Sequence, residues 1–541
     1  MTEEFSRASG YAEFMERFQA GYLTRRMTRD NVLTFADEVQ MPKEECLASC
    51  ATWVKGIAKG LSSLFQTEIP ASHIQEKCFE SDAERDTVSA VPYYNVTTDT
   101  FTYLPKKALP LIYNTNGLAA GNTLEEAFVQ GLSEIFERHN VIRCFFGNVT
   151  LPTIPDEYLK QFAKSYETIE HLRENGLEVI LKDCSMGEPY PLVAAIAIDR
   201  KHHAYHVHMG AHPVFEIALE RSLTEMFQGR SLAGVANSTE FAGCDTKNRS
   251  NSELVALLTK GCGQYPLSFF AGKPSYEFKP FIDRSKMSNA EMLKEFVAYI
   301  ASRGYEMYVR DISHLGFPSV SIIVPGMSEA FPHHLLDRFP DGLMYDKYKD
   351  AALHLEQMSL EQLGEYRSYL NRLVGDYGAA VIDFKALTAK DITGGDKKKA
   401  KFLARMVFSY TEWPFNRKNA IKYAKAALPF ADENEENYLS CICAFYEHLL
   451  AGMNTAQIMD GLSVIYDAQT LHQTILAVMS NDNPFKPFLV HCSAEHCRNC
   501  VYQEVCTVRE TERLIELIRK AAKEFDAKGA FEKVRALYQS L

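Results

Sequence analysis

The sequence predicts an α/β domain of mixed α+β type over residues 1–385, followed by an all-α domain over residues 401–541. Helical and strand-like patterns alternate in the first part, which is typical of an α/β or α+β domain. Beyond residue 401 the pattern is almost wholly helical. A length of 541 residues also exceeds what one hydrophobic core usually serves, so at least two domains are expected.

Four short segments of the first domain are predicted to be buried strands, because they are rich in β-branched residues and bounded by Gly or Pro. They span residues 177–185, 191–199, 306–313 and 319–327. Amphipathic helices lie between them. Paired glycines and a lysine run favour an interdomain linker at residues 386–400.

In the helical domain, residues 419–452 place small and aromatic side chains at the spacing of a helix pair. A tetratricopeptide-like unit has this pattern, and a generic helical bundle explains it about as well. Both descriptions stay open, and each gives an all-α second domain.

Composition excludes several classes of protein. The chain has 46% hydrophobic and 24% charged residues, as folded globular proteins do. A net charge of −12 argues against general binding of nucleic acid or of an anionic membrane, because phosphate affinity depends on clustered Lys and Arg. The sequence begins with acids where a signal peptide needs basic residues, and no segment reaches the roughly 20 apolar residues of a membrane span. A cytoplasmic protein is expected.

Two distant segments repeat an acidic pattern. The strings GLSEIFERH and GYAEFMERF carry Glu134 with Glu137 and Glu13 with Glu16, at the same spacing. On a helix such a pair falls on the face opposite to the apolar stripe. A solvated surface explains one pair readily, but the repetition of the pattern favours a shared function.

The second acidic helix carries further polar residues on the same face. At 100° per residue, Asn122, Glu126 and Gln130 share a side with Glu134 and Glu137. The T-x-x-E string at the head of this helix also fits a capping box, which is the structural alternative for its first glutamate.

If the two acidic helices lie side by side, like-charge repulsion requires cations between their carboxylates. Mg²⁺ prefers oxygen ligands and is commonly held by one or two carboxylates together with substrate phosphates. The pattern therefore suggests an ATP site, although the chain has no P-loop motif and no kinase-like Gly-rich loop. In residues 210–230, Arg221 and Glu225 stand four apart. This spacing fits a surface ion pair. It also fits a site in which Arg221 binds a phosphate and Glu225 binds metal or substrate.

These segments closely resemble the YcaO family, and within it the stand-alone type described as an accessory factor of ribosomal-protein methylthiolation. The strings that carry the resemblance are NGLAAGNTLEEAFVQGLSEIFER, GAHPVFEIALERSLTEMFQGR and IIVPGMSEAFP. The resemblance extends over residues 1–385 and implies an ATP- and Mg²⁺-using fold that phosphorylates a peptide carbonyl oxygen. A neighbouring Cys, Ser or Thr then gives an azoline, or an external sulfur source gives a thioamide.

The resemblance implies roles for individual residues. Those implied to contact nucleotide are Ser9, Asn122, Glu126, Arg221 and Glu225. Those implied to bind Mg²⁺ are Glu13, Glu16, Glu126, Glu134 and Glu137. No catalytic side chain is assigned.

Two departures from the family pattern bear on function. In the family, a strand and a Gly-Lys-Gly turn precede the first acidic helix, whereas this sequence begins MTEEFSRAS at that point. Either the true start lies upstream or part of the pocket has been lost, and the intact motifs further along favour an upstream start. The sequence also lacks the Pro-x-Pro-x-Pro end typical of azoline-forming relatives, which favours sulfur insertion or an accessory role.

A cysteine cluster lies near the end of the sequence. Cys492, Cys497, Cys500 and Cys506 are spaced C-x4-C-x2-C-x5-C. Thiolate clusters of this kind bind Zn²⁺ or an iron–sulfur cluster, and iron–sulfur is the favoured interpretation. Redox-active or incidental thiols are the alternative. The alternating histidines of KHHAYHVH fit a half-exposed strand and are left outside the predicted site.

Three hypotheses for function follow. The first is an ATP-dependent enzyme that modifies the amides of a peptide or protein substrate. The second is a non-catalytic nucleotide-binding protein whose helical tail recruits a methylthiotransferase or a similar client. The third gives the cysteine cluster the central role, in the delivery of sulfur or electrons. A sulfur-donor partner and a homodimer stay open, and no direct nucleic-acid or membrane partner is expected.

Overall fold

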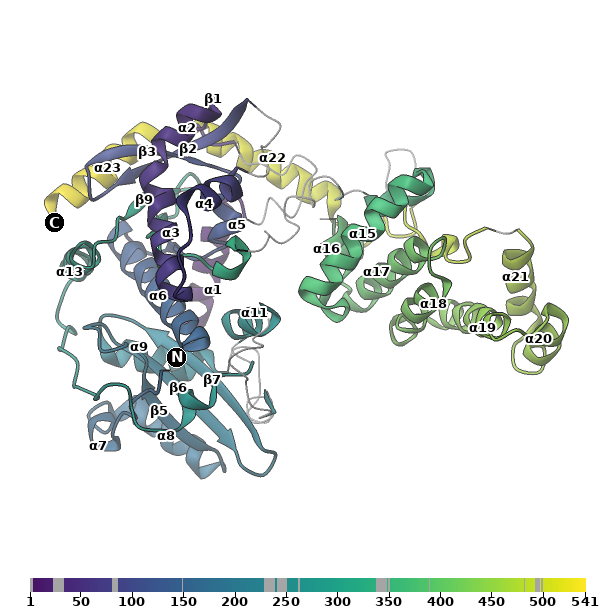
Figure 1. The fold of residues 1–541 in the computed structure, drawn as a ribbon, viewed down its shortest axis with the longest axis horizontal. Coiled ribbons are helices and arrows are strands. Elements are labelled where there is room, and N and C mark those ends of the chain that lie inside the picture. The colour runs from purple at the N-terminus through teal and green to yellow at the C-terminus, as the bar shows by residue number, and fades with distance from the viewer. Residues whose placement is uncertain are drawn as a thin grey trace. The chain divides into compact units, whose positions relative to one another are not determined.

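The computed structural model describes residues 3–22, 34–79, 86–147, 149–227, 239–240, 251–260, 263–336, 348, 351–388, 390–480, 482–491, 497 and 500–541. Figure 1 labels its helices and strands. Within these residues no helix combines the length and the apolar character needed to cross a membrane.

The chain forms two compact units. Unit 1 consists of Met1–Tyr22, Thr34–Phe339 and Arg519–Leu541, and unit 2 consists of Leu23–Leu33 and Pro340–Ile518. The predicted order of a mixed α/β region followed by a helical region is confirmed. The compact units part near residue 340 rather than at the predicted linker of residues 386–400, and the end of the chain belongs to unit 1.

Unit 1 contains a six-stranded antiparallel sheet. Its strands pair in the order β1–β2–β9–β10–β4, and β3 also pairs with β2. The strands are β1 Val39–Pro42, β2 Thr87–Asn95, β3 Thr100–Pro105, β4 Leu118–Ala120, β9 Tyr308–Asp311 and β10 Ser319–Ile323. The sequence predicted β9 and β10. It missed β1 and β3, and also β2, which contains Pro92, and β4, which has only three residues.

A second antiparallel sheet of unit 1 has the order β5–β6–β7–β8. The strands are β5 Glu178–Asp183, β6 Leu192–Asp199, β7 Ala204–Ala211 and β8 Thr239–Glu240. The predicted strands β5 and β6 are confirmed. Strand β7 is more buried than its alternating histidines suggested, since His206 is fully buried.

Helix α6 (Leu124–Phe146) packs against both sheets. It contacts β4 and β10 of the first sheet and β7 of the second. The predicted apolar stripe faces the core, where Phe128 and Ile135 are buried. Gly131 permits this close packing, because a Cβ there would lie 2.7 Å from Cδ1 of Ile322.

The other helices of unit 1 surround the sheets (Figure 1). Helix α1 packs against β4 and β10, α9 packs against β6 and β7, and α13 packs against α6. These helices are α1 Glu3–Gln19, α2 Lys43–Ser49, α3 Ala51–Phe65, α4 Ala71–Cys78, α5 Leu109–Ile112, α7 Asp156–Leu159, α8 Ala163–Glu174, α9 Phe215–Glu225, α11 Asn251–Lys260, α12 Leu267–Phe270, α13 Asn289–Ser302 and η3 Pro332–Leu335.

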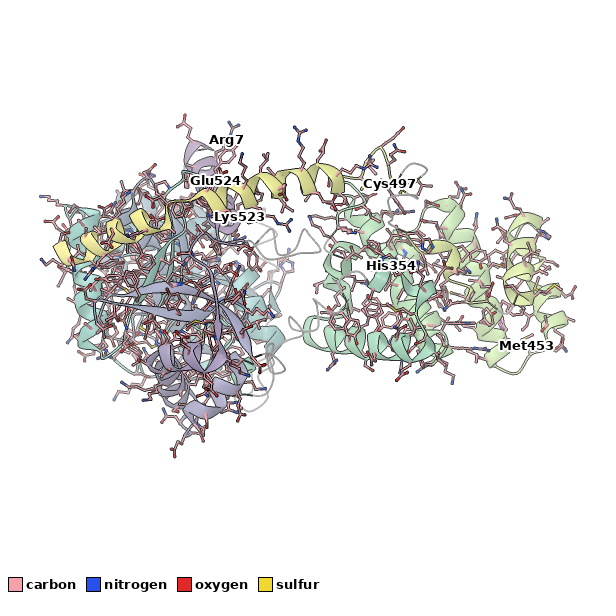
Figure 2. All side chains as sticks on the ribbon, turned by 90° about the horizontal axis from the view of Figure 1, so that it is seen from above. Arg7, His354, Met453, Cys497, Lys523 and Glu524 are labelled. Carbon is pink, nitrogen blue, oxygen red and sulfur yellow. The ribbon has the colours of Figure 1, made fainter. Side chains whose placement is uncertain are left out.

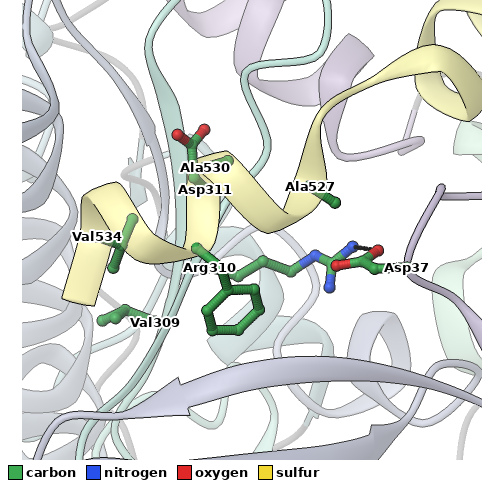
Figure 3. A pocket seen from close by; sticks show the side chains of 8 residues that line it. Asp37, Val309, Arg310, Asp311, Ala527, Ala530 and Val534 are labelled. Atoms are coloured by element: carbon green, nitrogen blue, oxygen red, sulfur yellow. Dashed lines mark hydrogen bonds and ion pairs between the residues drawn. The ribbon is translucent and has the colours of Figure 1, made fainter.

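The last helix of the chain, α23 (Ala527–Ser540), is part of the core of unit 1. It packs on β9 and β2. Figure 3 shows it beside the ion pair of Asp37 with Arg310, around a cavity of about 10 Å³. Further along the helix, Tyr538 meets Phe128 of α6 edge-on, with ring centroids 5.1 Å apart.

Unit 2 is helical throughout its described residues, as predicted. Its helices are η4 Ala351–Leu353, η5 Leu355–Gln357, α15 Leu360–Tyr377, η6 Ala379–Val381, α16 Phe384–Thr388, α17 Lys397–Glu412, α18 Arg417–Lys425, η7 Leu428–Phe430, α19 Glu433–Leu450, α20 Thr455–Leu462, α21 Ala468–Met479 and η8 Lys486–Phe488. Helix α22 (Val508–Glu524) begins in unit 2 and ends in unit 1. Successive helices α17, α18 and α19 pack on one another. The segment predicted to be a linker is part of this core, since Ile392 is buried within it.

Candidate functional site

The first acidic pair lies on α1, the helix that packs beside β4 and β10. Glu13 and Glu16 are both partly buried, and Glu13 pairs with Arg17 one turn further along. Ser9, one turn before Glu13, is exposed. The predicted helix is therefore present with its acidic pair.

Gln19 fixes the end of α1 to the first sheet. Its buried side-chain amide donates to the carbonyl of Phe317 (2.8 Å) and to the hydroxyl of Ser319 (2.6 Å). Its oxygen accepts from the backbone N–H of Leu315 at 2.7 Å. These bonds hold the last turn of α1 at a set position relative to β10, so the glutamates of α1 are held in place as well.

The head of α6 is capped by Thr123, whose hydroxyl accepts from the backbone N–H of Glu126 at 3.2 Å. The Glu126 carboxylate in turn accepts from the backbone and the side-chain amide of Asn122, at 3.0 to 3.2 Å. The predicted capping box is thus half formed. The Thr123 half is present, but the Glu126 carboxylate binds Asn122 and not the backbone N–H of Thr123.

Two turns further along α6, the second acidic pair meets a different set of partners. Glu134 pairs with Arg138 at 3.0 Å, and only 19% of its side chain is exposed. Glu137 accepts from the backbone N–H of Ala211, the last residue of β7, at 3.1 Å. The acidic face of α6 is therefore largely covered, unlike an ordinary solvated helix face.

Helix α9 brings a third group of charges to α6. Arg221 donates to the Gln130 side chain of α6 at 2.7 Å and lies 3.5 Å from Glu225. The other oxygen of Glu225 lies 3.7 Å from Nδ1 of His208 on β7. Gly210 permits this approach, because a Cβ there would lie 2.5 to 2.6 Å from backbone atoms of α9.

The carboxylates of the three helices are close enough to perturb one another. Burial and the neighbouring Glu134 raise the pKa of Glu16 to about 9. Burial and Glu225 raise the pKa of Glu137 to about 8, and burial raises that of Glu134. We refer to Glu16, Glu134, Glu137 and Glu225 as the acidic cluster. Its members need protons or cations in order to lie this close together.

The arginines beside the acidic cluster have donor atoms that the described carboxylates do not bind. Burial lowers the pKa of Arg221, but the surrounding carboxylates raise it on balance. The Nε atoms of Arg221 and Arg17 are buried and lack a hydrogen-bond partner within the part of the chain that the structure describes. Donors of this kind suit an anion such as a phosphate.

The residues of the acidic cluster fit Mg²⁺ and a nucleotide. All the donor groups are hard oxygens, which suit Mg²⁺, and unused guanidinium donors accompany them. Across the described residues no group of three or more His, Cys, Asp or Glu side chains is arranged to hold a metal ion. Mg²⁺ is commonly held by one or two carboxylates together with substrate phosphates.

The structure thus brings together several of the residues named from the sequence. Glu16, Glu134, Glu137, Arg221 and Glu225 converge, with Glu13 beside them. Asn122 and Glu126 form a pair of their own at the head of α6, and Ser9 is exposed. Their roles in binding nucleotide and metal stay predictions.

Two residues of this region were missed. His208 was left out because its strand looked half exposed, whereas it faces Glu225. Gln19 carries no motif, although it follows the repeated acidic string directly, and its importance comes from contacts some 300 residues away in sequence. No local pattern signals either contact.

The cysteine cluster gains no support as a metal centre. Cys497 (Figure 2), Cys500 and Cys506 are partly exposed free thiols. Cys492 lies outside the described residues, so the predicted set of four is not described as a whole. No zinc or iron–sulfur ligand group is seen among the cysteines that are described.

Comparison with known proteins places the chain in a family. The family model for the YcaO cyclodehydratase, ATP- and Mg²⁺-binding, matches residues 1–328. The chain belongs to the YcaO family. The YcaO domain therefore comprises most of unit 1, including α1, α6 and α9, and is of an ATP- and Mg²⁺-binding type.

Two curated relatives extend beyond the YcaO domain. The ribosomal protein S12 methylthiotransferase accessory factor YcaO of Escherichia coli is 25% identical over 519 residues, which cover 90% of this chain and 87% of the relative. An uncharacterized protein of Haemophilus influenzae is 28% identical over 427 residues, which cover 76% of this chain and 70% of the relative.

Solved YcaO structures are more distant. YcaO from Methanopyrus kandleri, bound with AMPPCP and Mg²⁺, is 23% identical with a TM-score of 0.32, over 46% of this chain and 66% of that one. A heterocyclase in complex with substrate and cofactor is 19% identical with a TM-score of 0.40, over 61% of this chain. The match spans only 44% of that heterocyclase.

Proposed function

We propose that this YcaO protein uses Mg²⁺ and ATP to activate a backbone amide of a peptide or protein substrate. The observation that carries the proposal is the acidic cluster, in which carboxylates from three helices surround arginines with unused donors. A structural ion-pair network would pair its charges, whereas this one leaves carboxylates in excess. The cytoplasm, where ATP is plentiful, is the proposed location.

The chemistry follows from how poor a leaving group an amide oxygen is. The carbonyl oxygen attacks the γ-phosphorus of ATP, and the bond from that phosphorus to ADP breaks. A nucleophile then adds to the carbonyl carbon and gives up its proton to solvent, and the carbon–oxygen bond breaks as phosphate leaves with the oxygen. In azoline formation the amide nitrogen also gives up its proton, so that a C=N bond forms. An external sulfide-level donor gives a thioamide, and a neighbouring Cys, Ser or Thr gives an azoline. Mg²⁺, when bound, would neutralise charge on the phosphates.

The side chains divide this work by their charge. Arg221 and Arg17 would bind phosphate oxygens through their Nε–H donors, which have no other partner among the residues that the structure describes. One or two of Glu16, Glu134 and Glu137 would hold each Mg²⁺ together with phosphate oxygens, with Glu13 beside them. Asn122 and Glu126, together with exposed Ser9, would contact the nucleotide. His208 and Gln130 orient Glu225 and Arg221.

The test is nucleotide binding and hydrolysis by the full chain. Mg²⁺-dependent binding of ATP is expected by isothermal titration calorimetry, and it should be lost in Glu134→Gln, because the substitution removes charge from the cluster without changing its size. Glu178→Gln, which alters only an exposed pair with Arg200, is the matched control. Equal binding by wild type and Glu134→Gln would exclude the proposed site.

A second candidate function is a non-catalytic one. The E. coli relative is named an accessory factor of a methylthiotransferase. A protein of that kind would bind nucleotide through the same cluster and recruit a methylthiotransferase or another client through unit 2. Phosphate release that stays at the background rate with Mg²⁺-ATP bound, and with a purified methylthiotransferase and its substrate added, would favour this candidate.

A further inference from the structure

Helix α21 of unit 2 leaves several large apolar side chains in solvent. One side of the helix is covered: Thr470 and Thr474 are buried, and Leu471, Ala477 and Val478 pack against the core of the unit. On the other side Leu476 is exposed by 54% and Met479 by 78%, and Ile475 beside them is also exposed. An amphipathic helix of a globular protein normally carries polar side chains on its solvent face.

More apolar surface lies close to α21 in the chain. Val464 and Ile465, in the turn that leads into α21, are among the most exposed large apolar residues of the described chain. Met453, in the turn before α20, is labelled in Figure 2 at the same end of unit 2 where Figure 1 places α20 and α21. Exposed aliphatic side chains gathered in this way indicate an interaction surface.

The charges next to this apolar surface in the sequence are mostly acidic. From Asp460 to Asp482 the sequence contains three Asp residues and no Lys or Arg, and the following Lys486 pairs with Glu356. Asp467 caps the start of α21, and the exposed Asp482 follows its end. Exposed Asp460 lies on α20. Helix α21 itself carries no charged side chain.

We infer that the exposed face of α21 is a docking surface for a basic amphipathic segment of another protein. Such a segment would place an apolar stripe on Ile475, Leu476 and Met479, and Lys or Arg near Asp467 and Asp482. Charge complementarity identifies this occupant, because interface cores are depleted of charge while the rim charges select the partner. The inference goes beyond ATP use in unit 1 and does not depend on it.

The same charges disfavour other occupants. A second copy of the chain would bring acidic rim against acidic rim, which costs free energy. An anionic membrane or a nucleic acid would be repelled in the same way. A basic protein segment is the occupant that both the apolar face and the acidic rim accept.

The test uses the full chain and two synthetic helical peptides. One peptide has a leucine stripe with lysines on its other faces, and the second has glutamates in place of the lysines. Fluorescence anisotropy should detect binding of the lysine peptide alone, and that binding should weaken as salt is raised. The variant Leu476→Gln with Met479→Gln should lower the affinity at least tenfold, because it removes the apolar contact and leaves the charge unchanged. Leu360→Gln, an equally exposed site on α15, is the matched control.

Each outcome decides the question. Equal affinity of the lysine peptide for wild type and for the α21 variant would show attraction to acidic surface in general and would overturn the inference. Absence of binding, or binding of both peptides, would also overturn it. A concentration-dependent dimer that the α21 variant abolishes in sedimentation equilibrium would identify a second copy as the occupant instead. The variant Asp460→Asn with Asp482→Asn should bind the lysine peptide more weakly, and this binding should depend less on salt.

Discussion

Helices α6 and α21 depart from amphipathic design in opposite ways. Helix α6 buries its apolar stripe as expected. Its acidic face is also largely covered, by α9, by the end of β7 and by α1, whose Glu16 lies close to Glu134. Helix α21 is placed with Thr474 against its unit and Met479 in solvent. In the first case a polar face is withdrawn from water, and in the second an apolar face is left in it.

The comparison shows where function is to be found in this chain. Burying carboxylates together and exposing aliphatic side chains are both unfavourable for an isolated protein. In both proposals the arrangement becomes favourable once its ligand is bound, namely cations with phosphates at α6 and a basic amphipathic segment at α21. Substitutions should therefore act on stability and ligand binding near α6, and on partner binding alone at α21.

The largest effect on stability is expected where α23 supports the buried face of α6. Tyr538→Ala removes a buried ring that packs edge-on against Phe128, and should lower the free energy of unfolding by about 3–5 kcal/mol. Tyr538→Phe is the control, since the hydroxyl is buried and lacks a hydrogen-bond partner among the described residues, so its removal should not destabilise. Urea unfolding measures both. A loss under 1 kcal/mol in Tyr538→Ala would contradict the assignment of α23 to unit 1.

The second prediction concerns the charges that surround α6. Arg221→Met leaves the carboxylates of the acidic cluster without their buried cation, and the affinity for Mg²⁺-ATP should fall about 100-fold, as for other truncated buried charge pairs. Arg221→Lys should keep part of the affinity but lose the forked donor geometry. Calorimetry with Arg173→Met as control separates this from a general charge effect, because Arg173 forms a partly exposed pair with Asp156. Unchanged affinity in Arg221→Met would show that the buried charges around α6 do not bind the nucleotide.

Part of this picture was accessible from the sequence. The 3.6-residue period and the capping string predicted α6, and the repeated spacing of Glu13 with Glu16 linked α1 to it, since both are local patterns. The contact of His208 with Glu225 joins a strand to a helix, and no periodicity reports such a tertiary contact. For the α21 region the sequence predicted helix only as part of residues 401–541, and apolar side chains occur on both sides of α21, so only the packed structure decides which side is covered.

Gln19 offers a third test, of how α1 is held against α6. Gln19→Leu removes three hydrogen bonds of a buried side chain and leaves their backbone and hydroxyl partners unpaired, which should destabilise the fold by about 1–3 kcal/mol. The affinity for Mg²⁺-ATP should fall as well, because the glutamates of α1 lose their set position, and a loss of about 1.4 kcal/mol of binding free energy would appear as a tenfold weaker affinity. Gln161→Leu, at an exposed site of unit 1, controls for the loss of an amide. Loss of stability without loss of affinity would show that Gln19 supports the fold alone.

A buried carboxylate outside the acidic cluster tests whether burial by itself has the expected cost. Burial raises the pKa of Glu329 to about 7, although the carboxylate accepts from the backbone N–H of Gly326 at 3.0 Å. The folded state therefore binds more protons than the unfolded state between about pH 4.5 and 7, and stability should fall as pH rises through this window, by at most about 1.4 kcal/mol per pH unit. Glu329→Gln should flatten this slope in urea unfolding at pH 5 and pH 7.5. An unchanged slope would assign the pH dependence to other groups.

The smallest effect on stability is expected at α21. Leu476→Gln with Met479→Gln changes two side chains that are mostly in solvent, so the free energy of unfolding should change by no more than about 0.5 kcal/mol, as at other exposed sites. The same variant should bind the lysine peptide at least tenfold more weakly than the wild type does. This separation of stability from binding is what distinguishes a docking face from a core that lacks a neighbouring helix. A destabilisation of several kcal/mol would mean that the face is packed against something within the chain, and α21 would then follow the same rule as α6.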